Sequence, residues 1–429
     1  MKVAILGGGI TGTSLADLLQ KKGVDYDLFE ASKRLGGLCK SETVDGFVAD
    51  RAGGHIIFSK NKEVLQYVLD AVEDLGTHES ERKSAIYYRG NFVRYPYENG
   101  LGDLPKEDNF ECLSTYIDAH FAREQGAEEP QNFRDWCDWR FGTGISRTFM
   151  HPYNEKIWKT DLEDMSIRWV SGRIPDAPVS DVIRASIGIE TEGYKHQSVF
   201  WYPLTGGFES IVTGIAKRLD QDRIHVGTPV ETVVQDADGY LVNGKRYDKV
   251  ISTIPLQQLA PTLGDIPAEI QAAFDGLTYT SVMSILVALD QPPESDRSWI
   301  YFPHPENGPF NRVTHISNYS PRNAPEGKSA LMAEVTYKGD IDAEACEKEV
   351  VDGLIRCGFA TADKVLFTRS WKNRFAYIVY SHDLEKNLEI VRKFLGNKGI
   401  DLLGRFGDYK YFNSDQCIES VMKYVKDFK

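Results

Sequence analysis

A glycine-rich turn near the N-terminus constrains the fold of this chain more than any other feature. The segment 7–12 reads Gly-Gly-Gly-Ile-Thr-Gly; it follows a short apolar run, residues 2–6, and precedes apolar residues at helical spacing. Gly7, Gly9 and Gly12 occupy the three glycine positions of a strand–turn–helix unit that binds a dinucleotide. In this unit the pyrophosphate lies at the helix N-terminus, where unpaired N–H groups and the helix dipole favour negative charge. The turn therefore predicts a dinucleotide-binding strand–helix–strand unit.

A carboxylate and a second glycine pair indicate which dinucleotide is bound. Glu30 ends the next apolar run, residues 26–30, at the spacing expected for a carboxylate that binds the adenosine ribose. Arg34 and the pair Gly36 and Gly37 follow soon after. A basic residue with paired glycines here resembles the extended fingerprint of flavoproteins of the amine oxidase, protoporphyrinogen oxidase and UDP-galactopyranose mutase superfamily. We therefore expect FAD rather than NAD.

The composition excludes several other classes of protein. The 429 residues correspond to roughly three domains of ~150 residues, and an aromatic content of 11% argues against disorder. A net charge of −13 without long basic runs disfavours binding of nucleic acid. The six cysteines form no Cys-x-x-Cys pair, so we expect free thiols, a cytoplasmic location and no metal site. No segment approaches the ~18 apolar residues of a membrane span.

The remaining sequence predicts two kinds of region, interleaved along the chain. Apolar spacing predicts an amphipathic helix at 62–75, a hairpin at 86–93 and a mostly helical stretch from about 108 to 195. Strands are expected at 250–255, 280–290 and 330–337, a long loop at 303–327, and helices at 342–358, 383–396 and 415–427.

The fold class expected is α/β, with a Rossmann-like FAD-binding domain interleaved with a mixed helical and antiparallel-sheet substrate domain. The expected boundaries are 1–80, 196–270 and 395–429 for the FAD-binding domain, 81–195 for a mostly helical insertion, and 271–394 for a sheet-containing substrate domain.

Four separated segments resemble those of UDP-galactopyranose mutases, and the eukaryotic-type branch more than the bacterial one. They follow in the family's order and, with the N-terminal fingerprint, span nearly the whole chain. The first contains the sequence Gly53-Gly54-His55, and each of the other three contains arginine and tyrosine. In chain order the segments are 53–59, 152–173, 309–321 and 404–416.

The resemblance implies an isomerisation between the six-membered and five-membered ring forms of a UDP-sugar, without net redox change, in cell-surface glycan biosynthesis. It also implies a reduced flavin, with NADPH or NADH as external reductant, whose N5 attacks the anomeric carbon while UDP leaves. Arginine suits the leaving diphosphate because its guanidinium stays ionised and binds phosphate oxygens bidentately. An acidic protein therefore needs only a local pair of arginines to bind this substrate.

The resemblance also assigns roles by position. It implies that Arg173 and Arg312 bind the diphosphate and that His55 lies near the N5 and O4 edge of the flavin. Substrate contacts are expected from Trp158, Tyr319, Tyr377 and Tyr411. Cofactor contacts are expected from Gly7, Gly9, Gly12, Glu30, Arg34, Gly36, Gly37, Val230, Gly404 and Arg405. Each of these residues also has an ordinary structural interpretation, as a surface arginine, a packing tyrosine, a core tryptophan or a turn glycine.

Three interpretations of the function are open at this point. The first is a flavin-dependent nucleotide-sugar mutase acting on UDP-galactopyranose or a related sugar. The second is an oxidase or dehydrogenase of the amine oxidase or protoporphyrinogen oxidase type, which the FAD fingerprint supports equally. The third is a flavin-binding protein without catalysis, a partner in a glycan-assembly complex. The sequence also leaves open which nucleotide sugar is used and whether the chain forms a homo-oligomer.

Overall fold

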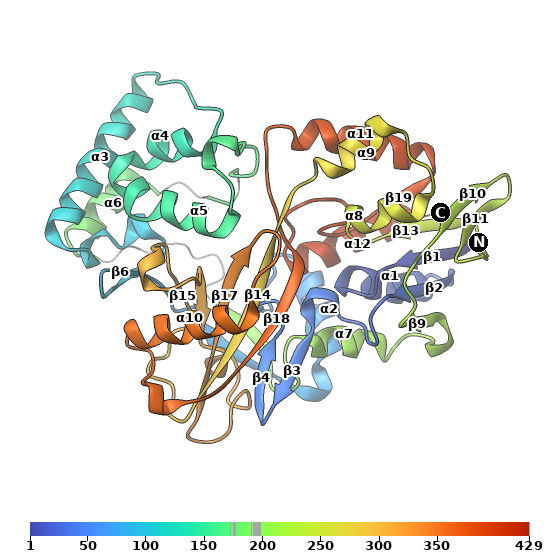
Figure 1. The fold of residues 1–429 in the computed structure, drawn as a ribbon, viewed down its shortest axis with the longest axis horizontal. Coiled ribbons are helices and arrows are strands. Elements are labelled where there is room, and N and C mark those ends of the chain that lie inside the picture. The colour runs from blue at the N-terminus through green and yellow to red at the C-terminus, as the bar shows by residue number, and fades with distance from the viewer. Residues whose placement is uncertain (172, 175–176, 190, 192–198, 429) are drawn as a thin grey trace.

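The computed structural model describes residues 1–171, 173–174, 177–189, 191 and 199–428. The molecule is elongated, with a parallel sheet and both chain termini at one end and a group of helices at the other (Figure 1). A large, mostly antiparallel sheet connects the two ends. The expected α/β fold class is confirmed.

The parallel sheet has five strands in the order β19-β13-β1-β2-β9, and all neighbouring strands are parallel. The strands are β1 (Lys2–Leu6), β2 (Asp25–Glu30), β9 (Ile224–Val226), β13 (Lys249–Ser252) and β19 (Ile400–Leu402). The predicted strand at 250–255 is confirmed as β13, which lies beside β1. Segments far apart in the sequence therefore build one Rossmann-like sheet.

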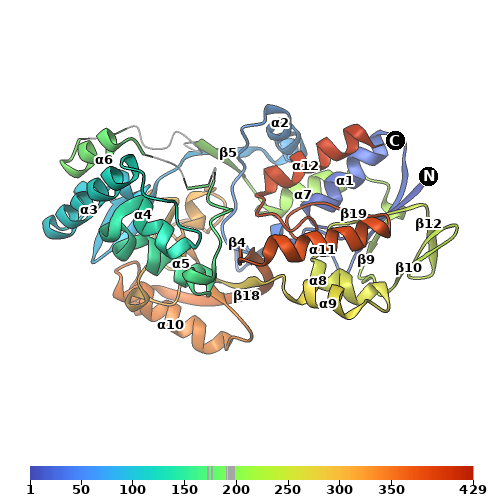
Figure 2. The same cartoon turned by 90° about the horizontal axis from the view of Figure 1, so that it is seen from above.

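Helices cover both faces of this sheet because alternate residues of its strands point to opposite sides. Val3 and Ile5 of β1 belong to a core with α1 (Ile10–Lys21) and α12 (Ser414–Asp427). Ala4 and Leu6 of β1 belong to a second core on the other side. Its elements are α8 (Leu256–Leu259), α9 (Ala268–Asp275), α11 (Leu384–Asn397), β10 (Val233–Asp236), β11 (Gly239–Val242) and β12 (Lys245–Tyr247). Figure 2 shows α1 and α12 on one side of the strands and α9 and α11 on the other.

The large sheet has seven strands in the order β18-β14-β17-β16-β15-β6-β7. Neighbouring strands are antiparallel except for the parallel pair of β6 and β15. The strands are β6 (Ser84–Tyr88), β7 (Asn91–Arg94), β14 (Tyr279–Leu289), β15 (Trp299–Tyr301), β16 (Arg312–Thr314), β17 (Ser329–Tyr337) and β18 (Val365–Ile378). β14 and β17 are almost fully buried, and α10 (Ala343–Arg356) packs on one face of the sheet.

The sequence prediction was wrong about two of these strands. β16 lies inside the predicted loop 303–327; it has three residues and its neighbourhood is rich in proline and glycine, so it shows no alternating pattern. β18 was not predicted, because it is an edge strand in which Arg369, Lys372 and Arg374 interrupt the apolar pattern. The predicted hairpin at 86–93 and the strands at 280–290 and 330–337 are confirmed.

The far end of the molecule is helical, as predicted for the described part of 108–195. The helices are α3 (Lys106–Glu124), α4 (Phe133–Ile145), α5 (His151–Trp158) and α6 (Val179–Ser186). Their shared core is rich in aromatic side chains, among them Phe133, Trp136 and Phe141. β6 and β7, from the expected helical insertion, join the large sheet, and α11, from the expected sheet-containing domain, packs on α9. The boundaries between domains stay a prediction.

Short elements connect the two halves of the molecule. They are α2 (Lys62–Ala71), α7 (Glu209–Ala216), the pair β3 (Ser41–Val44) and β4 (Phe47–Asp50), and the pair β5 (Thr77–Glu81) and β8 (Val199–Pro203). Within the described ranges, no helix is both long and apolar enough to span a bilayer, and no group of three or more His, Cys, Asp or Glu side chains could hold a metal ion.

Candidate functional site

The two glycine-rich turns lie directly against each other beyond the end of β1. Gly12 must be glycine, because a Cβ there would lie 1.8 Å from the carbonyl oxygen of Gly7. Gly9 and Gly36 form a parallel bridge, and the N–H of Gly36 donates to the carbonyl of Gly8 at 2.8 Å. A Cβ on Gly37 would lie 3.0 Å from the Cα of Gly9. The structure thus brings the predicted fingerprint glycines together in one narrow cradle at the N-terminus of α1.

Glu30 lies at the end of β2, beside this cradle. Its Oε2 accepts a hydrogen bond from the N–H of Gly8 at 2.8 Å, and its Oε1 accepts one from the N–H of Ser32 at 2.9 Å. The N–H of Thr228 donates to the Glu30 carbonyl at 2.9 Å, and Val230 follows in the same extended segment, packed against the second core. Glu30 and Val230 therefore lie on the same side of the cradle.

Arg34 pairs with two carboxylates next to the second glycine turn, and Arg405 follows a glycine that packs on α1. The Arg34 Nε lies 2.8 Å from the Oε1 of Glu209, and its Nη2 lies 2.7 Å from the Oε1 of Glu42. Arg405 follows β19, and its Nη1 and Nη2 donate to the carbonyls of Phe412 and Ala376, each at 2.7 Å. Gly404, which precedes it, packs on the first turn of α1, where its Cβ would meet Thr11 at 2.4 Å.

The histidine loop, residues 53–59, crosses the large sheet. Gly53 has φ of +92°, and a Cβ there would lie 2.4 Å from the carboxyl carbon of Glu334 on β17, so only glycine fits. The imidazole of His55 stacks on Phe208, with ring centroids 5.1 Å apart and planes at 25°. Its Nδ1 is buried, with no hydrogen-bond partner among the described residues. Burial and the charges of Arg312 and Arg405 lower the pKa of His55 to about 4, so the imidazole is neutral at pH 7.

Arg312 is held by a buried carboxylate that sequence reasoning missed. Arg312 and Glu334 face each other across β16 and β17, with the Nε and Nη2 of the arginine 2.7 and 2.6 Å from the Oε1 of Glu334. The Nη2 of Arg312 also donates to the carbonyl of Gly54 at 3.3 Å, and the hydroxyl of Tyr377 donates to Glu334 at 3.4 Å. Glu334 is 0% exposed. A single carboxylate in an otherwise uncharged strand, 329–337, is the sequence signal that could have revealed it.

The ionisation of this pair is set by two opposing effects. Burial acts to lower the pKa of Arg312, but the charge of Glu334 outweighs it and keeps the pKa of Arg312 above its ordinary value. Burial raises the pKa of Glu334, although the charge of Arg312 opposes this rise. The arginine is therefore ionised, and its charge is balanced by the carboxylate.

Arg173 and Arg405 share one aromatic ring. The guanidinium carbons of Arg173 and Arg405 lie 3.9 and 4.3 Å from the ring centroid of Tyr411. Tyr411 in turn stacks on Tyr377, with centroids 6.0 Å apart and planes at 28°. Burial lowers the pKa of Arg173, but an arginine stays ionised at physiological pH. Tyr377 connects this group to Glu334, so three arginines and two tyrosines form one cluster.

Trp158 and Tyr319 are more deeply packed than a direct substrate contact requires. Trp158 is 3% exposed, and its indole N–H donates to Asn154 at 3.0 Å. Its ring lies behind the cluster, with centroids 6.2 and 6.0 Å from those of Tyr377 and Tyr411. Tyr319 is 1% exposed and packs against the rings of Phe200 and Tyr202. The structure thus places Trp158 next to the cluster and Tyr319 in the core, and their substrate roles stay predictions.

Three further tyrosines next to the cluster were missed. Tyr301 of β15 contacts Tyr95 and Tyr153, with ring centroids 5.3 and 5.4 Å apart. Arg82 lies over the ring of Tyr95 at 4.7 Å. The charge of Arg312 acts on the phenol of Tyr153, whose pKa burial raises. These residues come from three separate parts of the chain, so no local sequence pattern indicated that they meet.

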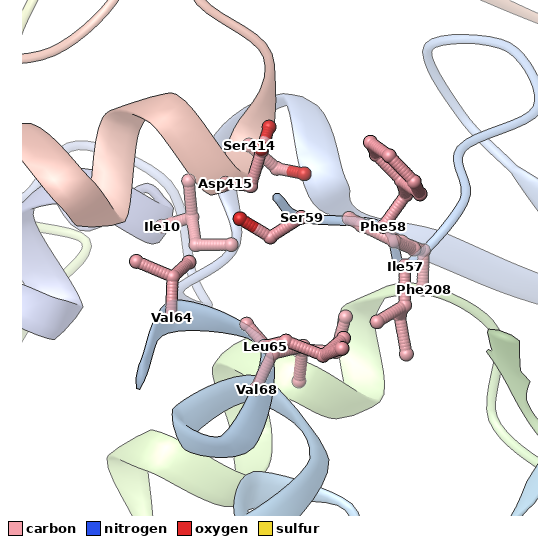
Figure 3. A pocket seen from close by; sticks show the side chains of 11 residues that line it. Ile10, Ile57, Phe58, Ser59, Val64, Leu65, Val68, Phe208, Ser414 and Asp415 are labelled. Atoms are coloured by element: carbon pink, nitrogen blue, oxygen red, sulfur yellow. The ribbon is translucent and has the colours of Figure 1, made fainter. Parts of the chain in front are cut away.

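A small apolar hollow lies at the other end of the histidine loop (Figure 3). It is lined by Phe58 and Ser59 of the loop, Ile10 of α1, Phe208, and the start of α12. The hollow therefore joins the loop to the first turn of the fingerprint helix. The glycine cradle at the N-terminus of α1 and the buried Nδ1 of His55, which has no hydrogen-bond partner among the described residues, are compatible with a flavin cofactor.

Comparison with known proteins supports this assignment. A family model described as "Flavin containing amine oxidoreductase" matches residues 10–384. A crystal structure of reduced UDP-galactopyranose mutase superposes with a TM-score of 0.91 at 27% identity, over 99% of this chain and 93% of that chain. A putative protoporphyrinogen oxidase from Exiguobacterium sp. 255-15 superposes with a TM-score of 0.74 at 20% identity, over 99% and 98% of the two chains.

Sequence relatives point to the same family. Coproporphyrinogen III oxidase of Staphylococcus aureus is 22% identical over 374 residues, covering 79% of this chain and 78% of its own. The probable flavin-containing monoamine oxidase A of Dictyostelium discoideum is 20% identical over 419 residues, covering 88% and 86% of the two chains. The resemblance to UDP-galactopyranose mutases is confirmed in the fold, and a flavin cofactor follows from the family. The chain belongs to the family of flavin-containing amine oxidoreductases.

Proposed function

We propose that this protein is an FAD-dependent nucleotide-sugar mutase that interconverts the pyranose and furanose forms of UDP-galactose or a related sugar. The observation that carries the proposal is the cluster of Arg173, Arg312 and Arg405 around Tyr377 and Tyr411. Among the described residues, Glu334 is the one carboxylate that forms an ion pair with an arginine of this cluster.

The charge balance of the cluster suits a diphosphate. Glu334 balances Arg312, whereas the donors of Arg405 are directed at carbonyls and Arg173 lies over a ring. The cluster therefore carries an excess of positive charge within a chain of net charge −13. Guanidinium groups bind phosphate oxygens by charge-assisted, often bidentate hydrogen bonds, and such bonds strengthen as charge develops on a leaving diphosphate.

FAD is the form of flavin that the cradle favours. The paired glycine turns admit a pyrophosphate at the N-terminus of α1, and Glu30 lies where an adenosine ribose would be held. When bound and reduced, the flavin would supply the electron pair that attacks the anomeric carbon. The chain itself would orient the sugar, hold the diphosphate with the arginines, and present a neutral His55 beside the ring.

The test is chromatography of nucleotide sugars after incubation of the purified protein with UDP-galactopyranose, with and without dithionite, and the reverse reaction from UDP-galactofuranose. Conversion only with reduced flavin is expected, and NADPH or NADH should replace dithionite. Arg312→Lys is the matched control for Arg312→Met, because lysine keeps the charge but loses the bidentate geometry. Absence of conversion of any UDP-sugar by a protein with bound, reducible FAD would rule the mutase out.

An oxidase is the second candidate, because the curated relatives include coproporphyrinogen III oxidase and a probable monoamine oxidase. An oxidase would pass electrons from its substrate to the flavin, so a porphyrinogen or amine would bleach the oxidised flavin under anaerobic conditions. The mutase predicts no bleaching by either compound. The two activities are therefore separated by one anaerobic absorbance experiment.

A further inference from the structure

Asp50 is a buried carboxylate that the proposed chemistry does not use. It ends β4 just before the histidine loop and is 0% exposed. Its Oδ1 accepts hydrogen bonds from the hydroxyl of Ser41 at 2.7 Å, the hydroxyl of Tyr202 at 2.9 Å and the N–H of Phe208 at 3.1 Å. Its Oδ2 faces the N–H of His55 at 3.4 Å. Four donors from four segments of the chain thus converge on one side chain.

Two of these donors are the backbone N–H groups of His55 and Phe208, the two residues whose rings stack on each other. Asp50 contacts the backbone of His55 directly, and it fixes the backbone of Phe208, whose ring stacks on the imidazole of His55. Loss of the carboxylate would therefore release the histidine loop on one side and the stacking ring on the other. No other described residue is hydrogen-bonded to the backbones of both His55 and Phe208.

A second chain of contacts leads from Asp50 to the glycine cradle. Ser41 donates its hydroxyl to Asp50, accepts from the N–H of Glu209 at 3.1 Å, and donates its own N–H to the carboxylate of Glu209 at 2.8 Å. Glu209 pairs with Arg34, which precedes the Gly36–Gly37 turn. Asp50 is therefore connected to both places where the chain approaches the expected cofactor.

We propose that Asp50 is a positioning residue that locks the histidine loop and the second glycine turn into one arrangement around the flavin. The proposal rests on the flavin site of the proposed function, not on its mutase chemistry. It acts through His55 and Phe208 and, by way of Ser41 and Glu209, through the second glycine turn, and it requires no contact of Asp50 itself with cofactor or substrate.

The electrostatics of Asp50 fit a positioning role. Its partners are neutral hydroxyl and backbone groups, and within the described part of the chain no cation is paired with it. Burial raises its pKa to about 6, against the opposing effect of its donors. A buried carboxylate without a cation costs stability unless hydrogen bonds satisfy it. Its four hydrogen bonds offset this cost and fix the geometry.

The test variant is Asp50→Asn, with Tyr202→Phe as matched control. The amide oxygen of asparagine can keep the three bonds made by Oδ1, but its NH₂ group then meets the N–H of His55, donor against donor. Tyr202→Phe removes one bond to the same carboxylate without touching His55. Each variant loses one of the four hydrogen bonds at Asp50, so their effects at this carboxylate differ mainly in the histidine loop.

The first measurement is titration of the full-length apoprotein with FAD, read by absorbance and flavin fluorescence. Asp50→Asn should weaken FAD binding about tenfold and shift the absorbance bands of the bound flavin, whereas Tyr202→Phe should change binding less than about twofold. Equal effects of the two variants would overturn the proposal. Failure of wild-type protein to bind FAD would instead overturn the flavin site of the proposed function.

The second measurement repeats both substitutions in a His55→Ala background. Because Asp50 is proposed to act partly through the imidazole of His55, Asp50→Asn should weaken FAD binding less in this background than in wild type, and the remaining effect reports the route through Ser41 and Glu209. An undiminished effect in this background would mean a merely structural role and would overturn the proposal. If Asp50→Asn does not fold, Phe208→Leu replaces it: it removes the ring stack, and its effect should disappear in the His55→Ala background.

Discussion

Arg312 and Arg173 are both proposed to bind the same diphosphate, yet the fold holds them by different physical means. Arg312 lies on a strand of the large sheet and is fixed by an ion pair with the fully buried Glu334. Arg173 lies in the segment between α5 and α6 and is held over the ring of Tyr411. The ion pair fixes the direction of a guanidinium but balances its charge. The aromatic ring orients a guanidinium while its charge remains available to a ligand.

The largest expected difference comes from removing each arginine in turn. Both Arg312→Met and Arg173→Met should lower kcat/KM at least ~100-fold, because each removes a guanidinium from the developing charge of the diphosphate. Only Arg312→Met should also destabilise the fold, by about 3 kcal/mol at pH 8, because it leaves Glu334 buried and unpaired. Arg173→Met should cost about 1 kcal/mol or less. Urea unfolding measures the loss of stability, and steady-state kinetics measure the loss of kcat/KM. Equal losses of stability in the two variants would contradict the view that Arg312 and Arg173 are held by different physical means.

The pH dependence of the Arg312→Met loss follows from the carboxylate left behind. Burial raises the pKa of Glu334, so in this variant the carboxyl group binds a proton more readily when folded than when unfolded. Its penalty is therefore full at high pH and decreases as the pH falls through the pKa of the folded state. Unfolding at pH 5 and at pH 8 should show a smaller loss at pH 5.

The complementary change, Glu334→Gln, should behave differently. It leaves the guanidinium of Arg312 buried without its counter-charge, which should cost about 3 kcal/mol. Acid gives no relief in this case, because arginine does not lose its proton. A diphosphate can replace the missing charge, so UDP should raise the Tm of Glu334→Gln more than that of wild type. Glu347→Gln is the control, since Glu347 bonds only hydroxyls of Thr368 and Ser370 among the described residues.

Variants of Tyr411 test how the aromatic ring contributes to the orientation of Arg173 and Arg405. Tyr411→Leu removes the ring under both Arg173 and Arg405, and each such contact contributes about 1 kcal/mol. KM for the UDP-sugar should rise about tenfold while kcat changes less, because the guanidinium groups keep their charge but lose their orientation. Tyr411→Phe keeps the ring and should change KM less than about twofold. Equal effects of the two variants would assign the role to the hydroxyl instead.

The sequence predicted the cradle more completely than the cluster. Gly7, Gly9 and Gly12 stand in one continuous segment, and their spacing reflects a local geometric need, as the 1.8 Å approach at Gly12 shows. The resemblance also identified Arg173, Arg312 and Tyr411 as residues, and the structure brings them into one cluster with Arg405. Local spacing is thus enough where one turn supplies the whole site.

The partners of the cluster could not be predicted, because they depend on the register of distant strands. Glu334 meets Arg312 only because β16 pairs with β17, and β16 is too short to show a strand pattern. The resemblance named Tyr377 as a residue, but not its contact with Glu334, because Tyr377 lies on β18, an edge strand without a clear apolar period. The constraint on Gly53 likewise arises from Glu334, far away in the sequence.

The smallest expected effect compares the electric fields of the arginines at one reporter, the imidazole of His55. Burial and, in decreasing order, the charges of Arg312 and Arg405 together lower the pKa of His55 to about 4, and Arg173 is not among the causes. The double variant Arg312→Met with Glu334→Gln, which removes the ion pair without leaving a charge, should move the pKa upward. Arg405→Met should raise it less, and Arg173→Met should leave it unchanged.

Nitrogen-15 NMR of the histidine rings can follow this titration, and His55→Ala identifies the signal among the nine histidines. A balanced ion pair has a weaker field at a distance than two isolated charges, but Arg312 lies nearest the loop through its bond to the Gly54 carbonyl. If Arg173→Met raises the pKa of His55 as much as the double variant does, all three arginines act on His55 through their combined charge. If the pKa of His55 rises only in the variants at Arg312 and Arg405, the arginine cluster acts on the histidine loop through these two residues, of which Arg312 contacts the loop directly.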